Sequence, residues 1–291
     1  MSRIGLVGVG LLGEAVATRL RAAGHAVVGY DVAPAAMDRL AALGGTPAKS
    51  AEDVARATNL VCTILPSLAT VEDAILGARG IVAAGRPGLT IVQMSTISPT
   101  LTERLARETA ARGLIFLDCP ISGTSAMVAK GNGVIFVGGE REPYERCKPV
   151  LESILPRAVH VGRAGQAMVL KLVANLLVAL NSAATAEAIN LARRAGLDPG
   201  IVVDVLADGA ATSRMLEVRG PLMVRGEFPA QMKLDLFMKD LHLIQDAART
   251  AGAPLPLTDI AERLYAAAQT AGHGGEDLAA VITELERSAR R

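Results

Sequence analysis

The sequence predicts an α/β protein in which a doubly wound domain with a mainly parallel sheet precedes an all-helical domain. In the first half of the chain, short apolar runs alternate with amphipathic stretches, which is the pattern of βαβ units. A glycine-rich segment follows the first apolar run, and the strand-like runs end near residue 162. A chain of 291 residues is long enough for two domains, which we expect at residues 1–163 and 164–291.

Apolar runs in the first half are expected to be strands, and the segments between them helices. The expected strands are residues 4–7, 26–30, 60–65, 90–94, 115–118 and 133–137. The clearest helical segments between them are residues 13–23, 35–43 and 99–112. A charged helix at residues 140–151 and a strand at residues 159–161 complete the first domain.

One long helix is expected to open the second domain. Its pattern follows Gly165, runs to residue 194 and ends before Gly196, which is typical of a C-terminal glycine. The stretch 167–192 is apolar enough to suggest a membrane span, but Lys171, Asn175 and Glu187 within it are costly in hydrocarbon. We therefore expect a helix that is buried in the protein, and no membrane partner.

Shorter helices follow. Asp198 and Pro199 are typical of an N-cap and a first helical position, and a helix is expected over residues 201–206. Others are expected at residues 239–251, 259–271 and 277–288, with a loop at residues 212–214, before Pro221, that shapes the substrate pocket.

Composition argues against several classes of function. Lys and Arg number 30 against 29 Asp and Glu, so the total charge indicates no basic surface for nucleic acid. Aromatic residues make up 2% of the chain and Trp is absent, which argues against base stacking. Cys62, Cys119 and Cys147 form no CxxC pair, so we expect neither disulfides nor a metal site, and a cytoplasmic setting.

The glycine-rich segment has the GxGxxG spacing of a dinucleotide-binding loop. It lies between an expected strand and an expected helix and consists of Gly8, Val9, Gly10, Leu11, Leu12 and Gly13. The glycines allow a tight turn and close approach of a pyrophosphate, and the helix N-terminus offers amide donors to the phosphates. This pattern predicts a Rossmann domain. A plain βα turn in a flavodoxin-like domain is the alternative.

Asp31 ends the second expected strand, where a carboxylate accepts hydrogen bonds from the adenosine ribose and repels a 2′-phosphate. The next residues, from Val32 to Ala35, include no Arg or Lys. We therefore expect NAD to be preferred, with NADP as the weaker alternative. The competing interpretation is that Asp31 only caps the next helix.

Other candidate site residues follow later strands, because ligands of doubly wound sheets lie beyond the carboxyl ends of the strands. Two such loops are residues 65–67 and 94–96. A third contains Ser122, Gly123 and Thr124, whose hydroxyl and backbone N–H groups suit a carboxylate. An ordinary turn explains the third segment equally well.

Lys171 and Asn175 are four residues apart on the long apolar helix and therefore share one of its faces. A lysine in an apolar stripe is costly unless it is paired or lies at a cleft, and partial desolvation lowers its pKa toward values useful for proton transfer. An asparagine beside it is suited to orient a substrate oxygen. The alternative is a lysine whose stem is buried and whose head reaches water.

Taken in order, these motifs resemble the β-hydroxyacid dehydrogenase family, which includes 3-hydroxyisobutyrate dehydrogenase and tartronate semialdehyde reductase. The resemblance spans essentially the whole chain. Its pieces are GLVGVGLLG at 5–13, LP at 65–66, STISP at 95–99, DCPISGT at 118–124, GQAMVLKLVAN at 165–175 and KDLHL at 239–243.

The resemblance implies roles for particular residues. Lys171 becomes the general acid/base, and Ser122, Gly123 and Asn175 become substrate-positioning residues. The implied cofactor contacts are the glycine loop, Asp31, Leu65, Pro66, Thr70 and Thr96, with Lys239 near the nicotinamide end. The resemblance also implies a homodimer or homotetramer.

The implied reaction interconverts a small β-hydroxy acid, such as 3-hydroxyisobutyrate, and its semialdehyde. The family usually has Gly-Gly after the serine and alanine before the proline, whereas this chain has Gly123-Thr124 and Cys119, so the substrate stays open. The alternatives are a reductase of the glyoxylate/succinate or tartronate semialdehyde type, an imine reductase, and a catalytically silent NAD-binding protein. The lysine at position 171 argues against the last two.

Overall fold

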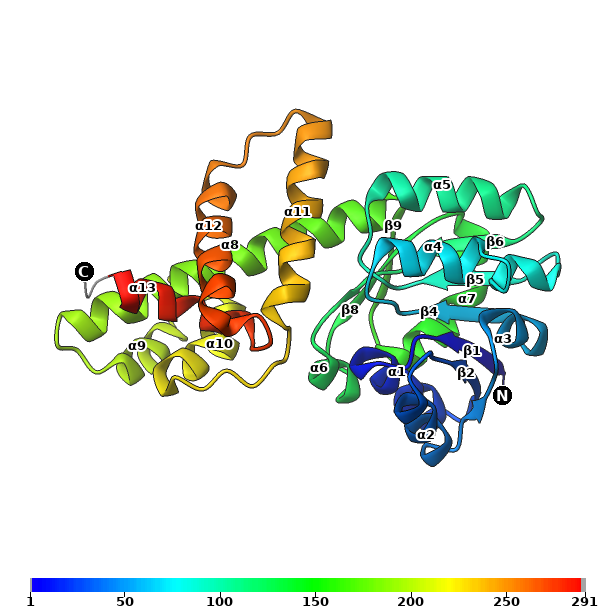
Figure 1. The fold of residues 1–291 in the computed structure, drawn as a ribbon, viewed down its shortest axis with the longest axis horizontal. Helices are drawn as coiled ribbons and strands as arrows, with labels where there is room; N and C mark the ends of the chain where they lie inside the picture. The colour runs from blue at the N-terminus through cyan, green and yellow to red at the C-terminus, as the bar shows by residue number, and fades with distance from the viewer. Residues whose placement is uncertain (1, 289–291) are drawn as a thin grey trace. The chain divides into compact units, whose positions relative to one another are not determined.

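The computed structural model describes residues 2–288 and forms two compact units, Met1–Lys171 and Leu172–Arg291. The first unit is an α/β unit and the second is helical, which confirms the predicted fold class and order (Figure 1). One helix, α8 (Gln166–Arg194), begins in the first unit and continues in the second. The expected domain boundary at residues 163/164 stays a prediction.

A nine-stranded sheet forms the centre of the α/β unit. Its strands are β1 (Arg3–Val7), β2 (Ala26–Tyr30), β3 (Thr46–Pro47), β4 (Leu60–Thr63), β5 (Thr90–Gln93), β6 (Ile115–Asp118), β7 (Ile121–Ser122), β8 (Val134–Gly138) and β9 (Ala158–Gly162). They lie in the order β3-β2-β1-β4-β5-β6-β8-β7, with β9 paired to β8. Strands β1 to β6 pair in parallel in the order of a dinucleotide-binding sheet, and β8 is antiparallel to β6 and β7.

Helices cover both faces of this sheet. One apolar cluster joins the strands to α1 (Leu11–Ala22), α2 (Pro34–Ala42), α6 (Ser125–Ala129) and α7 (Arg141–Ile154). The other joins them to α3 (Ala51–Ala57), α4 (Leu68–Leu76), the short helix η1 (Ile81–Ala84) and α5 (Pro99–Ala110). Neighbouring strand residues such as Leu6 and Val7 belong to different clusters because successive side chains alternate between the faces.

A row of residues in register crosses the sheet where the parallel strands end. Val7 is paired with Thr63, Thr63 with Gln93, Gln93 with Asp118, and Asp118 with Gly138 of β8. Thr63, Gln93 and Asp118 are fully buried. The carboxyl edge of the sheet, where ligands of this fold bind, therefore contains buried polar side chains.

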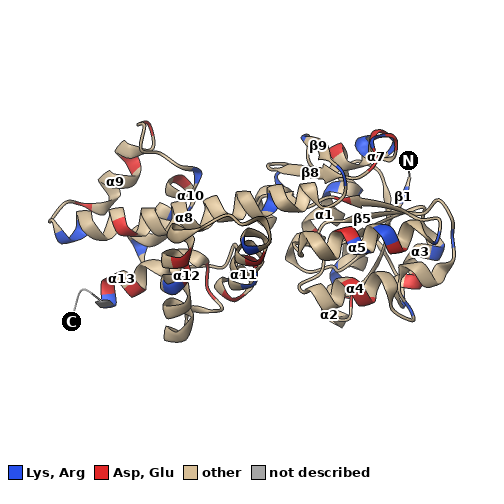
Figure 2. Cartoon of the chain, turned by 90° about the horizontal axis from the view of Figure 1, so that it is seen from above, with Lys and Arg blue, Asp and Glu red and all other residues tan. Residues whose placement is uncertain are grey.

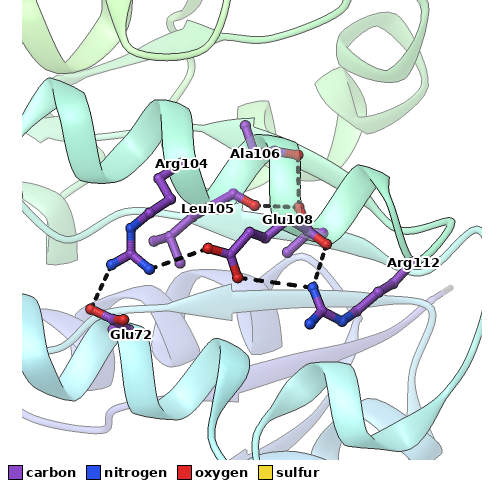
Figure 3. A network of polar contacts seen from close by, with 7 residues as sticks. Glu72, Arg104, Leu105, Ala106, Glu108 and Arg112 are labelled. Atoms are coloured by element: carbon purple, nitrogen blue, oxygen red, sulfur yellow. Dashed lines mark hydrogen bonds and ion pairs between the residues drawn. The ribbon is translucent and has the colours of Figure 1, made fainter.

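An ion-pair network connects α4 to α5, the helices that follow β4 and β5 (Figure 3). Arg104 Nη2 lies 2.7 Å from Glu72 Oε2, and Arg104 Nη1 lies 3.3 Å from Glu108 Oε1. Arg112 Nη1 donates to the backbone carbonyl of Glu108 at 2.7 Å. The hydrogen bond from Arg104 lowers the pKa of Glu72. The network is exposed and holds α4 to α5 on the surface.

The helical unit contains the rest of α8 and helices that pack around it. These are α9 (Pro199–Leu206), α10 (Arg214–Arg225), α11 (Leu234–Ala251), α12 (Pro256–Ala268), α13 (Ile282–Ser288) and the short η2 (Gln269–His273) and η3 (Leu278–Val281). The Tyr265 hydroxyl donates to the carbonyl of Ala179 at 2.9 Å, and the Tyr265 ring contacts Phe237. By length and hydropathy alone α8 resembles a membrane span, but its contact with Tyr265 is that of a core helix.

Basic and acidic side chains are interspersed over each unit (Figure 2). Many of them form ion pairs on one helix, such as Arg141 with Glu145 and Arg146 with Glu142. The distribution agrees with the nearly balanced total charge.

Several local predictions are confirmed, and others are wrong. Helix α8 has the predicted bounds, Gly196 has a φ of +79°, and the Asp198 side chain caps α9. Helix α11 begins at Leu234 rather than at residue 239, because the burial of Leu234 and Phe237 stabilises the earlier turn. Pro221 lies inside α10, which begins at Arg214 after the N-cap Ser213, so the expected loop is shorter than predicted. Helices α3, α4, α6 and α10 lie outside the helical segments that the sequence pattern identifies most clearly.

Candidate active site

The glycine loop joins β1 to α1, and each of its glycines has its own structural reason. A Cβ on Gly8, which has a φ of +94°, would lie 2.0 Å from the carbonyl oxygen of Ile64, and one on Gly13 would lie 2.2 Å from the carbonyl oxygen of Gly8. A Cβ on Gly10 would have no heavy atom within 4 Å. Gly8 and Gly13 therefore keep the turn tight, while Gly10 leaves open space at the N-terminus of α1. These residues fit the pyrophosphate of NAD(P).

Asp31 lies beside this loop. Its Oδ2 accepts a 2.7 Å hydrogen bond from the backbone N–H of Val9, and its Oδ1 accepts a 2.9 Å bond from that of Ala33. The N-cap residue of α2 is Ala33, which has no side-chain cap. Each carboxylate oxygen has a further acceptor position. Asp31 thus holds the glycine loop in place while it retains the capacity to accept ribose hydroxyls.

The loops after β4 and β5 are connected through Ser95. The Ser95 hydroxyl accepts a 2.8 Å hydrogen bond from the N–H of Leu65, and the amide of Gln93 bonds both backbone groups of Ser95. Thr70 forms a capping box with Ser67 at the start of α4. Leu65, Pro66 and Thr96 therefore lie in ordered loops at the carboxyl edge of the sheet, and Thr70 lies in the first turn of α4.

Ser122 is the last residue of β7, which follows β6, and Gly123 and Thr124 come directly after it. Ser122 and Gly123 are partly buried, and Gly123 has an extended backbone with φ +159°. The Thr124 hydroxyl accepts a 3.2 Å hydrogen bond from the N–H of Met127 and so caps α6. The Thr124 hydroxyl therefore has a local structural role, and the Ser122 hydroxyl is the better candidate for holding a substrate carboxylate.

Lys171 and Asn175 are both buried on α8, with exposed fractions of 7% and 4%. In the helical unit, Nδ2 of Asn175 donates a 2.8 Å hydrogen bond to Oδ2 of Asp240. The other oxygen of Asp240 lies 3.3 Å from Nζ of Lys239. Lys171 belongs to the α/β unit, whereas Asn175, Lys239 and Asp240 belong to the helical unit.

The structure adds Asp240 to the candidate residues. A charged pair such as Lys239-Asp240 at the expected start of a helix is usually solvated, but Asp240 is 4% exposed. It lies three residues after the buried Phe237 and one before the buried Leu241, on the apolar face of α11. A carboxylate at a core-facing position was the signal in the sequence that could have identified it.

Comparison with known proteins identifies the family of this chain. Residues 3–162 match the model of the NAD-binding domain of 6-phosphogluconate dehydrogenase, and residues 165–285 match that of NADP-dependent 3-hydroxyisobutyrate dehydrogenase. The chain belongs to the β-hydroxyacid dehydrogenase family. It is an NAD(P)-dependent oxidoreductase that acts on hydroxyl groups.

Relatives of known activity extend over the full chain. The L-threonate dehydrogenase of Cupriavidus necator is 37% identical over 284 residues, which cover 97% of this chain and 96% of that protein. The 2-hydroxy-3-oxopropionate reductase of Escherichia coli is 34% identical, with 99% and 98% covered. The crystal structure of 3-hydroxyisobutyrate dehydrogenase from Salmonella typhimurium is 31% identical, covers 97% of this chain and 99% of its own, and superposes with a TM-score of 0.89.

Proposed function

We propose that this dehydrogenase interconverts a small β-hydroxy acid, of the 3-hydroxyisobutyrate type, and its semialdehyde, with Lys171 as the general acid/base. The observation that carries the proposal is the buried pair Lys171 and Asn175 on one face of α8. A buried lysine and a buried amide, one helical turn apart, suit a reaction in which a hydroxyl group must be oriented and must lose a proton.

In the oxidation, neutral Lys171 accepts the proton of the substrate hydroxyl at Nζ. In the reduction, its ammonium returns that proton to the developing alkoxide. NAD(P) supplies the hydride acceptor or donor when it is bound. The protein's task is therefore proton transfer and orientation.

Asn175 orients the reacting hydroxyl. Because its Nδ2 donates to Asp240, its Oδ1 is available as the acceptor for a substrate hydroxyl. Ser122 and the backbone N–H groups of Gly123 and Thr124 hold the substrate carboxylate. Lys239 is proposed to lie near the nicotinamide end of the bound cofactor, as the family resemblance implies.

NAD is the proposed preferred cofactor, and NADP the weaker one. The Asp31 carboxylate is held next to the glycine loop, where it repels a 2′-phosphate. Val32, the next residue, is 84% exposed and apolar, so it offers a 2′-phosphate no positive charge. Thr70 and Thr96 are proposed to contact the cofactor with Leu65 and Pro66.

We further propose a cytoplasmic homodimer or homotetramer. Val169, Val173 and Leu177 recur every four residues on α8 and are 47%, 48% and 52% exposed. An apolar stripe of this kind on one helix is suited to burial against a second copy of the chain. Light scattering at micromolar concentration tests this proposal, and a monomer would contradict it.

The substrate is proposed within the class that the relatives' names cover. L-threonate, 3-hydroxyisobutyrate, glycerate and L-serine should be assayed with NAD and with NADP by the absorbance of the reduced cofactor, and 2-hydroxy-3-oxopropionate in the reverse direction. Turnover of at least one of them is expected, and Lys171→Ala should abolish it. If the wild type turns over none of them and reduces cyclic imines instead, the assignment to hydroxy acids is wrong. If it turns over nothing yet binds NAD, it is a silent NAD-binding protein.

A further inference from the structure

Asp118, the last residue of β6, makes its hydrogen bonds to the first turn of α8. Its Oδ2 accepts hydrogen bonds from the backbone N–H groups of Gly165 at 3.1 Å and Met168 at 3.0 Å. The donors are 47 and 50 residues away in sequence, and the Asp118 side chain is fully buried. The end of a central strand is thereby joined to the start of the helix that carries Lys171.

This arrangement replaces a local helix cap. The first amides of a helix have no partner within the helix and are usually satisfied by the side chain of the preceding residue. Here the preceding residue is Gly165, which has no side chain and has a φ of +93°. Asp118 therefore supplies from the sheet the acceptor that α8 does not supply itself, and its negative charge lies at the positive end of the helix dipole.

The sheet is shaped to admit this contact. Gly138 of β8 is paired with Asp118 in register. A Cβ on Gly138 would lie 2.8 Å from the carbonyl oxygen of Arg163, 3.2 Å from Oδ2 of Asp118 and 3.3 Å from the N–H nitrogen of Ala167. Only glycine at position 138 lets the start of α8 lie this close to the strand ends.

A buried carboxylate at this place is costly for the protein. Burial raises the pKa of Asp118 to about 7, although the two backbone hydrogen bonds act in the opposite direction. No residue in the described part of the chain donates to its Oδ1. A local Ser or Thr cap would satisfy a helix end without burying a charge. A costly ionisable group beside a candidate site is a sign of functional constraint.

We propose that Asp118 is a positioning residue for catalysis: it fixes the first turn of α8 against the sheet and thereby sets the place of Lys171, three residues after Met168. This inference rests on the proposed role of Lys171. Displacement of a reacting group by about 1 Å can reduce the rate by about 100-fold. A loosened first turn should therefore lower kcat more than it affects binding of the cofactor.

The charged groups around the cap are few among the described residues. Glu103 of α5 covers Gly165 and forms a 3.9 Å ion pair with Arg163, and both side chains are exposed. The Cys119 thiol follows Asp118 in the chain, and its pKa is raised by burial and by the Asp118 charge. Lys171 lies further along α8. With Asp118 ionised, its bonds to the helix amides are charge-assisted, and protonation weakens them.

The test compares Asp118→Asn and Asp118→Ala in the full-length enzyme, with Leu117→Ala as the matched control. Leu117 is the adjacent, fully buried residue, but its side chain packs in the apolar cluster on the opposite face of the sheet. Asp118→Ala should lower kcat by about 10- to 100-fold with NAD affinity near that of the wild type. Asp118→Asn keeps an oxygen acceptor for the two amides and should retain more activity than Asp118→Ala.

The pH profile of the reduction gives a readout that a purely structural role would not change. In that direction Lys171 must be protonated, so its titration lowers kcat at high pH, whereas protonation of Asp118 should lower kcat as the pH falls below about 7. We expect this acid-side decrease in the wild type and in Leu117→Ala, and its loss in Asp118→Asn.

The outcomes separate the two proposals. Any one of three results would overturn the positioning role. These are a wild-type kcat in Asp118→Ala, an acid-side decrease of kcat in Asp118→Asn that equals that of the wild type, and a loss of kcat in Leu117→Ala as large as that in Asp118→Ala. If Asp118→Ala does not fold, the pH profile of kcat in Asp118→Asn tests the positioning role by itself. Activity that survives in Lys171→Ala overturns the proposed function instead, whatever the Asp118 variants show.

Discussion

The side-chain amide of Asn175 donates a 2.8 Å hydrogen bond to Oδ2 of Asp240, and each of the two residues is only 4% exposed. The bond joins α8 to α11 and fixes which end of the Asn175 amide can accept a hydrogen bond from a substrate. An asparagine held in this way is pre-organised for orientation rather than for proton transfer.

Removal of the Asn175 amide should therefore weaken substrate use without abolishing it. Asn175→Ala should raise KM and lower kcat by less than Lys171→Ala does. Asp240→Asn should have a similar but smaller effect, because the new amide no longer selects one orientation of Asn175. Steady-state kinetics of the single and double variants test this coupling. Additive effects would show that the two residues act independently.

Lys171→Ala should remove catalysis and leave folding and NAD binding intact. General acid–base groups contribute about 10²–10⁴ in rate, so the loss should appear mainly in kcat. Lys171→Arg should not restore activity, because a guanidinium does not release its proton near neutral pH. Steady-state kinetics and fluorescence titration with NADH check both variants. Wild-type kcat in Lys171→Ala would show that the lysine is only structural.

Asp31 is expected to control cofactor choice and loop order together. Asp31→Ser with Val32→Arg should shift kcat/KM toward NADP by removing the repulsion and adding a phosphate partner. The same change replaces the two carboxylate oxygens that accept from Val9 and Ala33 with one shorter hydroxyl, so activity with NAD should fall and the melting temperature should decrease. Val32→Arg alone is the control, since it keeps both bonds. A wild type that already prefers NADP would refute the assignment.

The stability of the protein should depend on the ionisation of Asp118. Its pKa is raised on folding, so the protonated form stabilises the native state; this contribution is complete below about pH 3.8 and is lost as the pH rises to about 7. The rise corresponds to about 4 kcal/mol. Urea unfolding of the wild type and Asp118→Asn between pH 4.5 and 8 should show that the variant becomes relatively more stable as the pH increases. A constant difference would contradict the raised pKa.

Arg219 and Asp277 form a buried ion pair in the helical unit, with Nε 3.0 Å from Oδ1 and side-chain exposures of 4% and 1%. Asp277 also accepts backbone hydrogen bonds from Gln231, Met232 and Ala279, so it orders the segment that leads into α11. Arg219→Met should lower the free energy of unfolding by about 3–5 kcal/mol, because it leaves a buried carboxylate unpaired. The exposed pair of Arg141 with Glu145 provides the control, since Arg141→Met should change stability by less than about 1 kcal/mol.

Much of this protein is determined by local sequence. The glycine spacing at 8–13 predicts the dinucleotide loop, because Gly8 takes the positive φ of the turn and Gly13 packs against the carbonyl of Gly8. Gly196 marks the end of α8, and the capping pair Asp198-Pro199 marks the start of α9, because cap chemistry acts within one turn. The same local signals placed Lys171 and Asn175 on one helical face.

Other features were decided only by the tertiary structure. Nothing adjacent to Asp118 or Asp240 in the sequence indicates that their partners lie on α8, because those partners are 47 to 65 residues away. From its neighbours in sequence alone, a charged side chain is expected to be solvated. Only the packing of other elements over it buries it, and a buried charge then depends on a distant hydrogen-bond partner. For the same reason α11 begins earlier than its pattern of charges suggests: the burial of Leu234 and Phe237 outweighs the local start signal at Lys239.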